Sequence, residues 1–476
     1  MRNTLSRRGF VKGVGLLMGA AGIGGCGIPK TDDVKNARFD ANGLTLRKRG
    51  HKYPWWVKTV DQMTTELDPA KAKRPGRLNA AGAALMSNEK AGAMQAKAKA
   101  KTIEGITNNT PGRSLPDYAL QNAAQGYMTK SVGTFDNKPM MSVDTRNTNE
   151  SWFPFTPQSL GLPAWEASPE EASKVVTAAG IQLGASQVGF TTLNPDWLYN
   201  NITFDPEAST HESNLSGKRK KKLVLPTSYK YCVALITQGP RDLLIRNQSA
   251  LGGAGDRAAY ARIEIASTSL IRFIKALGFN AISMLTSSIG PVIPHAIKAG
   301  LGELGRMNRM ISPIYGGNIR IDVILTDLPL AIDKPIDFGL QKFCKNCKVC
   351  ATACPSGALS LADEPYWTPA NAYSAPGKKT YFEDSAKCAE YFISQGTFCS
   401  TCLSVCPWSK MDKTALHDIS KVLSSQIPAA GNFLKKMDES FGYGLVKLDS
   451  PEMADWWDLD IPEQGIDSFQ GMEERS

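Results

Sequence analysis

The sequence contains little histidine, no long apolar segment and no phosphate-binding P-loop. Four of the 476 residues are histidine, and they form no His-rich metal site. No hydrophobic run reaches the ~18–20 residues needed to cross a bilayer, which excludes a polytopic membrane protein. The phosphate-binding P-loop pattern is also missing. The chemistry of this protein must therefore be carried by other residues.

The charge of the chain is unevenly distributed. There are 55 Lys and Arg against 45 Asp and Glu, a net charge of +10. The one dense basic run, Lys218–Lys222, contains no aromatic residue. Proteins that bind single-stranded nucleic acid combine basic residues with aromatic residues. A solvated loop near an anionic membrane surface fits this run better. Residues 438–476 are strongly acidic. The composition therefore predicts no nucleic-acid partner.

The first 26 residues have the composition of an export signal. Arg7–Phe10 begins with paired arginines, Val14–Ile23 is apolar and glycine-rich, and no acidic residue precedes Asp32. These features indicate a signal segment rather than a membrane span, and the paired arginines resemble a twin-arginine signal. That route exports folded, cofactor-loaded proteins, so exported cysteines need not be disulfide-bonded. Cys26 ends a loose lipoprotein cleavage box, and both lipidation and ordinary cleavage nearby remain open.

The length, at roughly 100–200 residues per domain, allows two to four domains. Tyr231–Thr237 and Ile319–Thr326 are predicted to be buried strands, and a helix is predicted from a cap at Asp256 to Leu277, ending at Gly278. Alternating helices and strands indicate an α/β (α+β) fold. The predicted organisation is a signal over 1–26, an N-terminal arm and loop-rich region over 27–168, a catalytic domain over 169–335, a ferredoxin-like domain over 336–415 and an acidic tail over 416–476.

Eight of the ten cysteines lie in two runs, each ending in Cys-Pro. The spacing C-x2-C-x2-C-x3-C-P is typical of bacterial ferredoxins, in which the fourth cysteine of each run binds the other cluster. The sequence therefore predicts two [4Fe–4S] clusters. Their ligand sets, called here the first and the second cluster site, are Cys344, Cys347, Cys350 and Cys406, and Cys354, Cys388, Cys399 and Cys402.

Zinc and disulfides explain these cysteines less well. A zinc ion needs four ligands, so the third closely spaced cysteine of each run would be surplus. Disulfide frameworks belong mainly to small domains without a core. The ten residues between Cys388 and Cys399 depart from the ordinary spacing, which predicts an inserted loop before Cys399. Cys232 lies in a predicted strand and is expected to be a buried thiol.

The order of several short motifs resembles one known family. A twin-arginine signal is followed by the glycine-rich Ala299–Arg306, by Ser312–Gly316, by Thr326–Leu330, by Asp333–Ile336 and by both cysteine runs. In this order the chain is similar to the catalytic subunit of respiratory reductive dehalogenases. The resemblance covers nearly the whole chain and is densest over 256–408.

The resemblance implies a nitroreductase-like domain holding a base-off corrinoid, with two [4Fe–4S] clusters supplying electrons. Co(I) would activate the carbon–halogen bond, and the reaction would be R–X + 2e⁻ + H⁺ → R–H + X⁻. The chain agrees in lacking Asp-x-His-x-x-Gly, the motif of a histidine ligand below cobalt. Its histidines (His51, His211, His295 and His417) are expected to be structural or surface residues.

The family places a proton-donating tyrosine before the glycine-rich segment, and Tyr260 is the match. An unperturbed tyrosine stays protonated at neutral pH, and a nearby arginine eases proton release. Arg320 is the expected partner, with Arg306 and Arg309 as rivals. Many relatives carry Ser where Ala261 stands. The alternative interpretation of Tyr260 is a packed helix residue without a catalytic role.

Four further residues are expected to line the corrinoid pocket. Relatives often carry Asn at the position of Thr286, which would change the polarity of the pocket. Gly300, Gly302 and Gly305 would let the backbone approach the corrinoid, although glycines at these positions are equally compatible with ordinary turns.

The resemblance also implies partners and a location. We expect a small organohalide substrate (a chlorinated alkane or alkene), a small integral-membrane anchor subunit, a respiratory electron donor and a place at the outer face of the cytoplasmic membrane. A homodimer is compatible with the sequence. One alternative is an exported iron–sulfur electron-transfer subunit without its own substrate chemistry. Another is a tRNA-modifying epoxyqueuosine reductase, against which the export signal argues.

Overall fold

The computed structural model covers the whole chain. Predictions for the signal over 1–26, for most of the N-terminal arm, for Lys218–Lys221 and for most of the acidic tail fall outside the described residues, as do Cys26, His51, His211 and His417. The residues that the structure describes are 53, 56–74, 76, 90–115, 117–118, 134–135, 138–139, 157, 163–207, 212–214, 222–287, 289–409, 421, 425, 445–448 and 450–459.

The centre of the molecule is an antiparallel sheet in the order β4-β8-β12-β9. Its long middle strands, β8 (Tyr231–Gln238) and β12 (Ile319–Thr326), confirm the two strands predicted from the sequence. The outer strands are β4 (Gln187–Thr192) and β9 (Ala281–Ser283). Because every pairing in this sheet is antiparallel, the predicted α/β class takes its α+β form rather than that of a parallel sheet.

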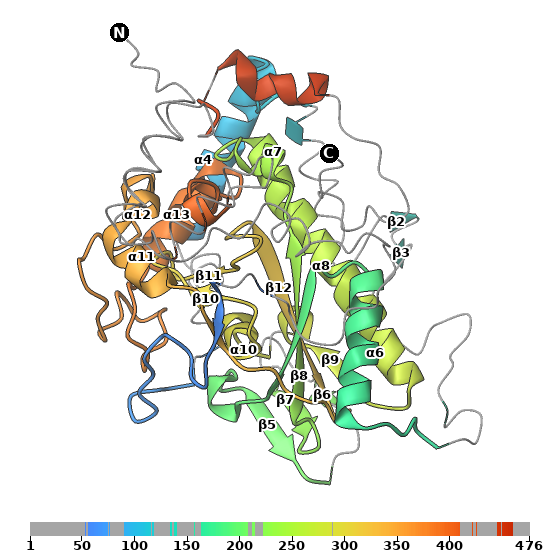
Figure 1. Cartoon of the computed structure of the whole chain (residues 1–476). Helices are drawn as coiled ribbons and strands as arrows, with labels where there is room; N and C mark the ends of the chain where they lie inside the picture. Colours follow the sequence, from blue (N-terminus) through green and yellow to red (C-terminus); the bar gives the residue numbers. More distant parts are fainter. Residues whose placement is uncertain are drawn as a thin grey trace, which may run out of the picture.

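Helices cover both faces of the central sheet (Figure 1). α6 (Pro169–Gln182) and α8 (Ala250–Ala276) pack on one face, where Val233 and Leu235 of β8 point. α10 (Val292–Lys298) lies on the other, with Cys232 and Ala234. Alternate residues of one strand therefore enter two different cores, which explains its unbroken apolar sequence. Cys232 is fully buried and burial raises the pKa of its thiol, as expected for a buried cysteine.

Helix α8 begins two turns earlier than predicted. Ser249 is its N-cap, and its hydroxyl accepts a hydrogen bond from the Gly252 amide at 3.2 Å. The prediction that Asp256 caps this helix is therefore wrong, because Asp256 lies inside the helix and faces β12. Glycines are poor helix formers, so the glycine-rich start of α8 is not recognisable as helix from the sequence. Packing requires glycine here, because a Cβ on Gly255 would lie 2.6 Å from the Leu243 Cβ. The helix ends as predicted at Gly278, which has a φ of +95°.

The cysteine runs lie in a group of short helices at one end of the sheet. These are α11 (Leu340–Asn346), α12 (Val349–Thr352), α13 (Ser385–Gln395) and α14 (Thr401–Ser404). Trp408 lies in the core shared by α11, α12 and α14 and meets Phe338 edge-on with 4.8 Å between ring centroids. From the N-terminal region, α4 (Lys90–Thr107) packs against α13. Part of the N-terminal region thus packs directly against the cysteine-bearing helices.

Small sheets connect the remaining segments. A three-stranded sheet places β7 (Lys222–Pro226) between β5 (Ile202–Asp205) and β6 (Glu212–Asn214). The other short elements are the pairs β1 (Lys58–Thr59) with β13 (Ile336–Asp337), β10 (Glu303–Leu304) with β11 (Met310–Ile311) and β2 (Thr134–Phe135) with β3 (Lys138–Pro139), the helices α7 (Arg241–Leu244) and α9 (Met284–Ser287), and the 3₁₀ turns η4 (Pro195–Trp197), η5 (Pro407–Ser409) and η6 (Pro451–Asp458).

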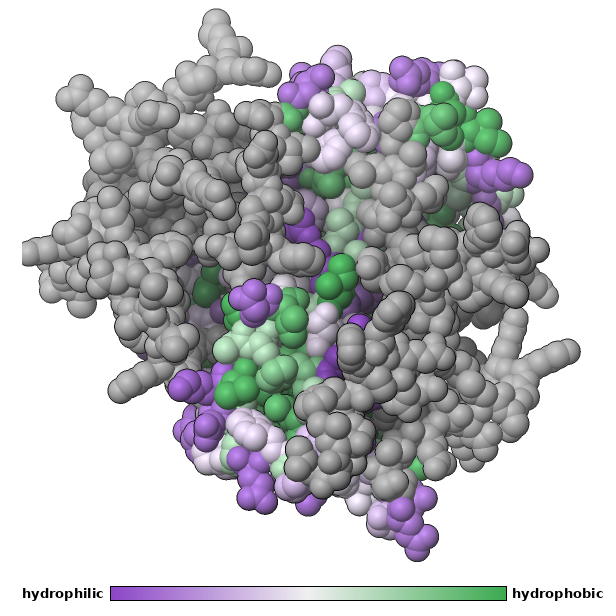
Figure 2. All heavy atoms as spheres, turned by 90° about the vertical axis from the view of Figure 1, so that its right-hand side faces the viewer, coloured by the Kyte–Doolittle hydropathy of each residue, from purple (hydrophilic) through white to green (hydrophobic). Residues whose placement is uncertain are grey.

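The exposed surface mixes polar and apolar side chains. On the face shown in Figure 2, apolar residues gather in the middle and hydrophilic residues lie at the lower edge. In the part of the chain that the structure describes, no helix combines the length and the apolar character needed to cross a bilayer.

Candidate functional site

The first cluster site surrounds a cavity between the two cysteine runs. Three of its thiols come from the first run, and the fourth, Cys406, comes from the second. The same cavity is lined by Arg306, Met307, Ile311, Phe343 and Pro407. Apart from the guanidinium and the thiols its wall is apolar, which limits water around any group held there. The structure therefore brings together the four cysteines predicted to bind one cluster.

Local structure explains how these four thiols converge. Cys344 lies in the last turns of α11, Cys347 is its C-cap, and Cys350 lies in α12, so three thiols follow two short consecutive helices. Cys406 approaches from the other side, because Pro407 starts a 3₁₀ turn whose Trp408 is buried among Phe338 and Phe343. The aromatic core thus fixes the fourth thiol opposite the other three.

The second cluster site gathers the other four cysteines. Cys402 in α14 interacts electrostatically with both Cys399 and Cys354, and Cys388 in α13 interacts with Cys402. The ten residues between Cys388 and Cys399 are mostly the rest of α13, which ends at Gly396 with a φ of +69°. The expected inserted loop is therefore largely a helical insertion.

The donor chemistry of both sites fits cubane clusters. Burial raises the pKa of Cys344 to about 12 and that of Cys402 to about 12, so these thiols need a cation to hold them as thiolates. In a [4Fe–4S] cluster each thiolate binds a different iron, which spreads four sulfurs around one cubane. Among the described residues, no three His, Cys, Asp or Glu side chains are placed to hold a single metal ion.

The predicted proton donor, Tyr260, lies in α8 beside the predicted arginine. The guanidinium carbon of Arg320, from β12, is 4.7 Å from the centroid of the Tyr260 ring. Arg320 also forms an ion pair with Asp256, one turn before Tyr260 in the helix. Asp256 in turn accepts a hydrogen bond of 3.0 Å from the Ser400 hydroxyl. A continuous chain of contacts thus joins Tyr260 to the residue after Cys399, a ligand position of the second cluster site.

The structure separates the three candidate arginines. Arg306 lines the first cluster site and stacks on Tyr381 instead of Tyr260. Arg309 pairs with Glu383 at 2.6 Å. Burial raises the pKa of Tyr260, while the positive charge of Arg309 acts to lower it. Arg320 is therefore the ring partner, and Arg309 is the arginine that favours the tyrosinate.

Two further residues near Tyr260, Arg257 and Glu264, were not predicted from the sequence to belong to the site. Arg257 stacks on Phe398 at 5.0 Å, and its Nε and Nη1 are buried without a hydrogen-bond partner among the described residues. The Nε of Arg320 is in the same situation. Unsatisfied buried donors cost free energy, so a ligand with oxygen acceptors, such as the amide-bearing rim of a corrinoid, suits this place. Glu264, one turn after Tyr260, has its pKa raised to about 7 by burial.

The glycines expected to face a corrinoid have close neighbours within the protein. Gly300 has a φ of +75°, and a Cβ there would collide with the Lys334 carbonyl oxygen. A Cβ on Gly302 would collide with the carbonyl oxygen of Ile311, and one on Gly305 would lie 2.9 Å from the Ile311 Cγ1. Internal packing therefore suffices to require glycine here, and corrinoid contact remains a prediction.

Thr286 and His295 complete the predicted residues. Thr286 lies in α9, but its side chain falls outside the described part of the structure. His295 is fully buried, and its ring meets Trp197 edge-on at 5.1 Å while accepting a hydrogen bond from the Asn194 amide at 3.4 Å. Burial lowers the pKa of His295 to about 4, so it remains neutral. These contacts give His295 a structural role.

Two protein-family models match parts of this chain. Residues 52–216 match the family described as reductive dehalogenase subunit, and residues 343–409 match the 4Fe-4S double cluster binding domain. The tetrachloroethene reductive dehalogenase of Sulfurospirillum multivorans is 27% identical over 69% of this chain and 67% of that protein. The tetrachloroethene reductive dehalogenase of Dehalobacter restrictus is 30% identical over 70% of this chain and 63% of its own length.

Longer and structural comparisons give the same result. The trichloroethene reductive dehalogenase of Dehalococcoides mccartyi is 23% identical over 98% of this chain and 99% of its own length. A solved reductive dehalogenase, described as suggesting a mechanism for B12-dependent dehalogenation, shares the fold with a TM-score of 0.59 at 22% identity, over 90% of this chain and 53% of that one. The chain thus spans about half of the solved structure and about two thirds of the tetrachloroethene enzymes.

These matches bear on the predicted cofactors and family. The double-cluster match and the B12-dependent relative support two [4Fe–4S] clusters and a corrinoid as the cofactors. The mixed α/β fold with a double-cluster domain is common to the structural relatives. The predicted resemblance is confirmed: this chain is similar in sequence and in fold to the reductive dehalogenases, a family of oxidoreductases.

Proposed function

We propose that this protein is a corrinoid-dependent reductive dehalogenase that replaces halogen by hydrogen on a small organohalide. Relatives named for tetrachloroethene and trichloroethene support a chlorinated alkane or alkene as the substrate. The observation that carries the proposal is the continuous contact from Tyr260 through Arg320 and Asp256 to Ser400. A proton donor and an electron-transfer site lie on one network, as the reaction R–X + 2e⁻ + H⁺ → R–H + X⁻ requires.

The protein's own side chains would supply and control the proton. Burial holds the Tyr260 phenol protonated by raising its pKa, so the proton is available at neutral pH. The Arg309 charge offsets part of this rise, which eases release of the proton to the developing carbanion. Arg320 lies against the ring and is itself fixed by Asp256. Together they set both the position and the acidity of the donor.

The corrinoid would supply the two-electron reductive cleavage of the carbon–halogen bond. Unpartnered buried donors of Arg257 and Arg320 are suited to acceptors on its rim or on the substrate. His295, whose ring is taken up by Trp197 and Asn194, is not available as a lower ligand, in line with base-off binding. The antiparallel sheet between helix layers supports a nitroreductase-like domain.

The cellular setting belongs to the same proposal. The twin-arginine pattern before residue 26 supports export and a place at the outer face of the cytoplasmic membrane. Attachment there would depend on a small integral-membrane anchor subunit. Electrons would come from a respiratory donor to the two clusters, in anaerobic organohalide respiration.

Purified protein tests the proposal directly. We expect one corrinoid and two [4Fe–4S] clusters per chain, and turnover of chlorinated alkenes or alkanes with reduced viologen as electron donor. Tyr260→Phe should lower the turnover number by about 10²–10⁴-fold while leaving both clusters and the corrinoid bound. Full activity in Tyr260→Phe would refute the assigned donor. Clusters without corrinoid would instead support an exported electron-transfer subunit.

A further inference from the structure

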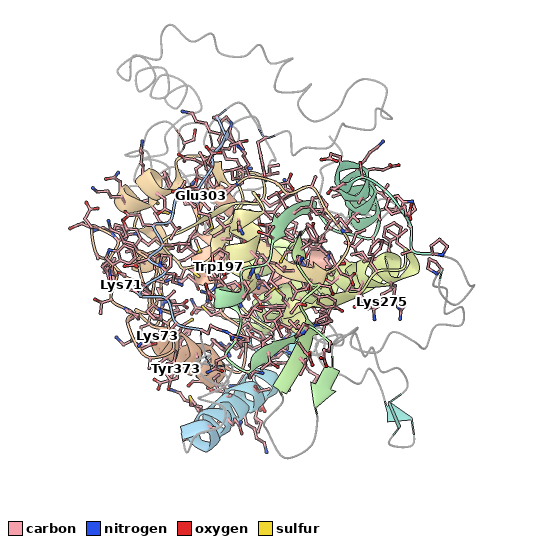
Figure 3. The ribbon with its side chains drawn as sticks, turned by 90° about the horizontal axis from the view of Figure 1, so that it is seen from below. Lys71, Lys73, Trp197, Lys275, Glu303 and Tyr373 are labelled. Carbon is pink, nitrogen blue, oxygen red and sulfur yellow. The ribbon has the colours of Figure 1, made fainter. Side chains whose placement is uncertain are left out.

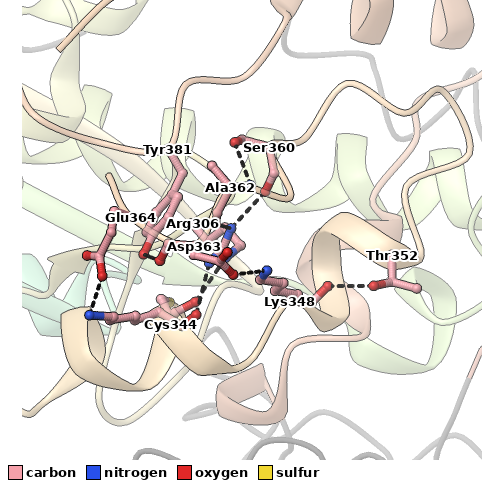
Figure 4. A network of polar contacts seen from close by, with 10 residues as sticks. Arg306, Cys344, Lys348, Thr352, Ser360, Ala362, Asp363, Glu364 and Tyr381 are labelled. Carbon is pink, nitrogen blue, oxygen red and sulfur yellow. Dashed lines mark hydrogen bonds and ion pairs between the residues drawn. The ribbon is translucent and has the colours of Figure 1, made fainter. Parts of the chain in front are cut away.

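Arg306 is a buried cation whose hydrogen bonds all go to backbone carbonyl groups. Its side chain is 1% exposed. Nε donates to the Cys344 carbonyl at 2.9 Å and Nη2 to that of Lys345 at 3.2 Å, at the end of α11. Nη1 donates to the carbonyls of Ser360 and Ala362, both at 2.8 Å (Figure 4). One guanidinium therefore joins the ligand-bearing helix to the segment after the first cysteine run.

Among the described residues, the positive charge of Arg306 has no buried counterion. Among the described residues no carboxylate forms an ion pair with it, and its face lies 3.7 Å from the Tyr381 ring centroid. Asp363, the acidic group nearby in Figure 4, is 87% exposed and pairs with Lys348. Water screens such exposed charges, whereas a charge within an apolar wall acts over several ångströms. Arg306 also lines the cavity of the first cluster site.

The second cluster site has the opposite arrangement. Arg309, whose charge acts on Cys402 and Cys388, is paired with Glu383 at 2.6 and 3.3 Å through its two terminal guanidinium nitrogens. The Glu383 carboxylate also lies against the thiol of Cys388. The positive charge of Arg309 is thus partly offset by a carboxylate that itself touches a ligand position. The first site therefore has a buried cation beside it, whereas the second site has an ion pair beside it.

We propose that Arg306 is a positioning residue that gives the first cluster site the higher reduction potential of the two. Reduction of a cluster, [4Fe–4S]²⁺ + e⁻ → [4Fe–4S]⁺, adds one negative charge, and local charge and hydrogen bonding set its potential. A buried cation favours the reduced form. In the one-electron steps the first site accepts the first electron from an external reductant and the second site accepts the next. The inference rests on the proposed cluster ligands, independently of any organohalide.

Redox titration of the cluster-loaded full-length protein, followed by EPR with titanium(III) citrate as reductant, tests this. The wild-type protein should show two separate one-electron steps, and Cys347→Ser should move only the step at higher potential. Arg306→Met should lower the equilibrium constant for that step by about tenfold, which is about 59 mV for one electron. Arg306→Lys should keep most of the potential. The step at lower potential should stay in place in both variants.

Two variants serve as controls. Lys342→Met removes an exposed positive charge from the same helix, α11, and should shift neither step because solvent screens it. Glu383→Gln removes the carboxylate at Cys388 and should raise only the step at lower potential. Both steps moving together in Arg306→Met would indicate a general structural effect.

Three results would overturn the proposal: an Arg306→Met protein with both clusters and unchanged potentials, equal shifts in Arg306→Met and Arg306→Lys, or a wild-type first site that is reduced last. If Arg306→Met does not retain the first cluster, the proposal is tested by the order in which the two wild-type clusters are reduced and by the potential of the first cluster in Arg306→Lys. No organohalide is present in these titrations. A protein with the expected potentials and no dehalogenation would therefore refute the proposed function alone.

Discussion

The two cluster sites share a spacing motif but differ in their surroundings. The first is enclosed by an apolar wall with one unpaired buried arginine, Arg306. The second is next to an ion pair, Arg309 with Glu383, and is joined through Ser400 to Asp256 and the Tyr260 network. The motif therefore determines which metal centre can form, while we expect the neighbouring residues to set its potential and its connection to Tyr260.

Substituting single cysteines tests whether each cluster takes its fourth ligand from the other cysteine run, as the structure indicates. Cys350→Ala and Cys406→Ala should each halve the iron content and remove the same EPR signal, although the two cysteines belong to different runs. Cys354→Ala should remove the other signal. Iron analysis with EPR of the reduced proteins measures this, and we expect the largest effect here, complete loss of one cluster. If Cys354→Ala and Cys350→Ala remove the same signal, each run holds its own cluster.

The connection of the second site to Tyr260 can be broken at Asp256. Asp256→Asn keeps an acceptor for Ser400 but leaves Arg320 as a buried, uncompensated charge. Loss of one partner from a buried pair costs about 3 kcal/mol or more, so the melting temperature should fall. We also expect turnover to fall about tenfold, because Arg320 is released from the Tyr260 ring, while both EPR signals persist.

Asp363→Asn is the matched control for Asp256→Asn. It breaks the exposed pair between Asp363 and Lys348 near the first site and should leave both turnover and melting temperature unchanged, since exposed pairs contribute little. An Asp256→Asn protein with wild-type turnover would remove Asp256 from the network that supports Tyr260.

The sequence allowed the cluster ligands to be predicted because their spacing is fixed by the geometry of a cubane. Its limits appear at α8 and at Arg306. A glycine-rich start hid the first turn of α8, and only the packing of α8 against β12 gives Asp256 its partner. The role of Arg306 depends on where four backbone carbonyls point, and no residue pattern encodes that. From the sequence, Arg306 was a candidate for the partner of Tyr260 only because it is an arginine.

A second buried group, the Glu303 carboxyl, also distinguishes the first site from the second. It leads to the prediction with the smallest expected effect, a dependence of the free energy of unfolding on pH. Glu303 lies within the body of the molecule (Figure 3) and is fully buried. It accepts hydrogen bonds from Thr64 at 2.5 Å and from the Phe338 amide at 2.8 Å, at the start of α11. In the described part of the chain no cation pairs with it, in contrast to Glu383.

Burial raises the pKa of Glu303 to about 7, with a smaller contribution from the charge of Asp337. The folded protein therefore holds a proton that the unfolded chain has lost above pH ~4.5, so stability falls as pH rises through this interval. Between pH 5 and pH 7 the loss is about 2 kcal/mol at 1.36 kcal/mol per pKa unit. Glu303→Gln should remove this slope, measured as the difference in melting temperature between wild type and variant at each pH. Equal slopes in the two proteins would mean that Glu303 is ionised when folded, and its negative charge would then oppose that of Arg306 beside the first cluster.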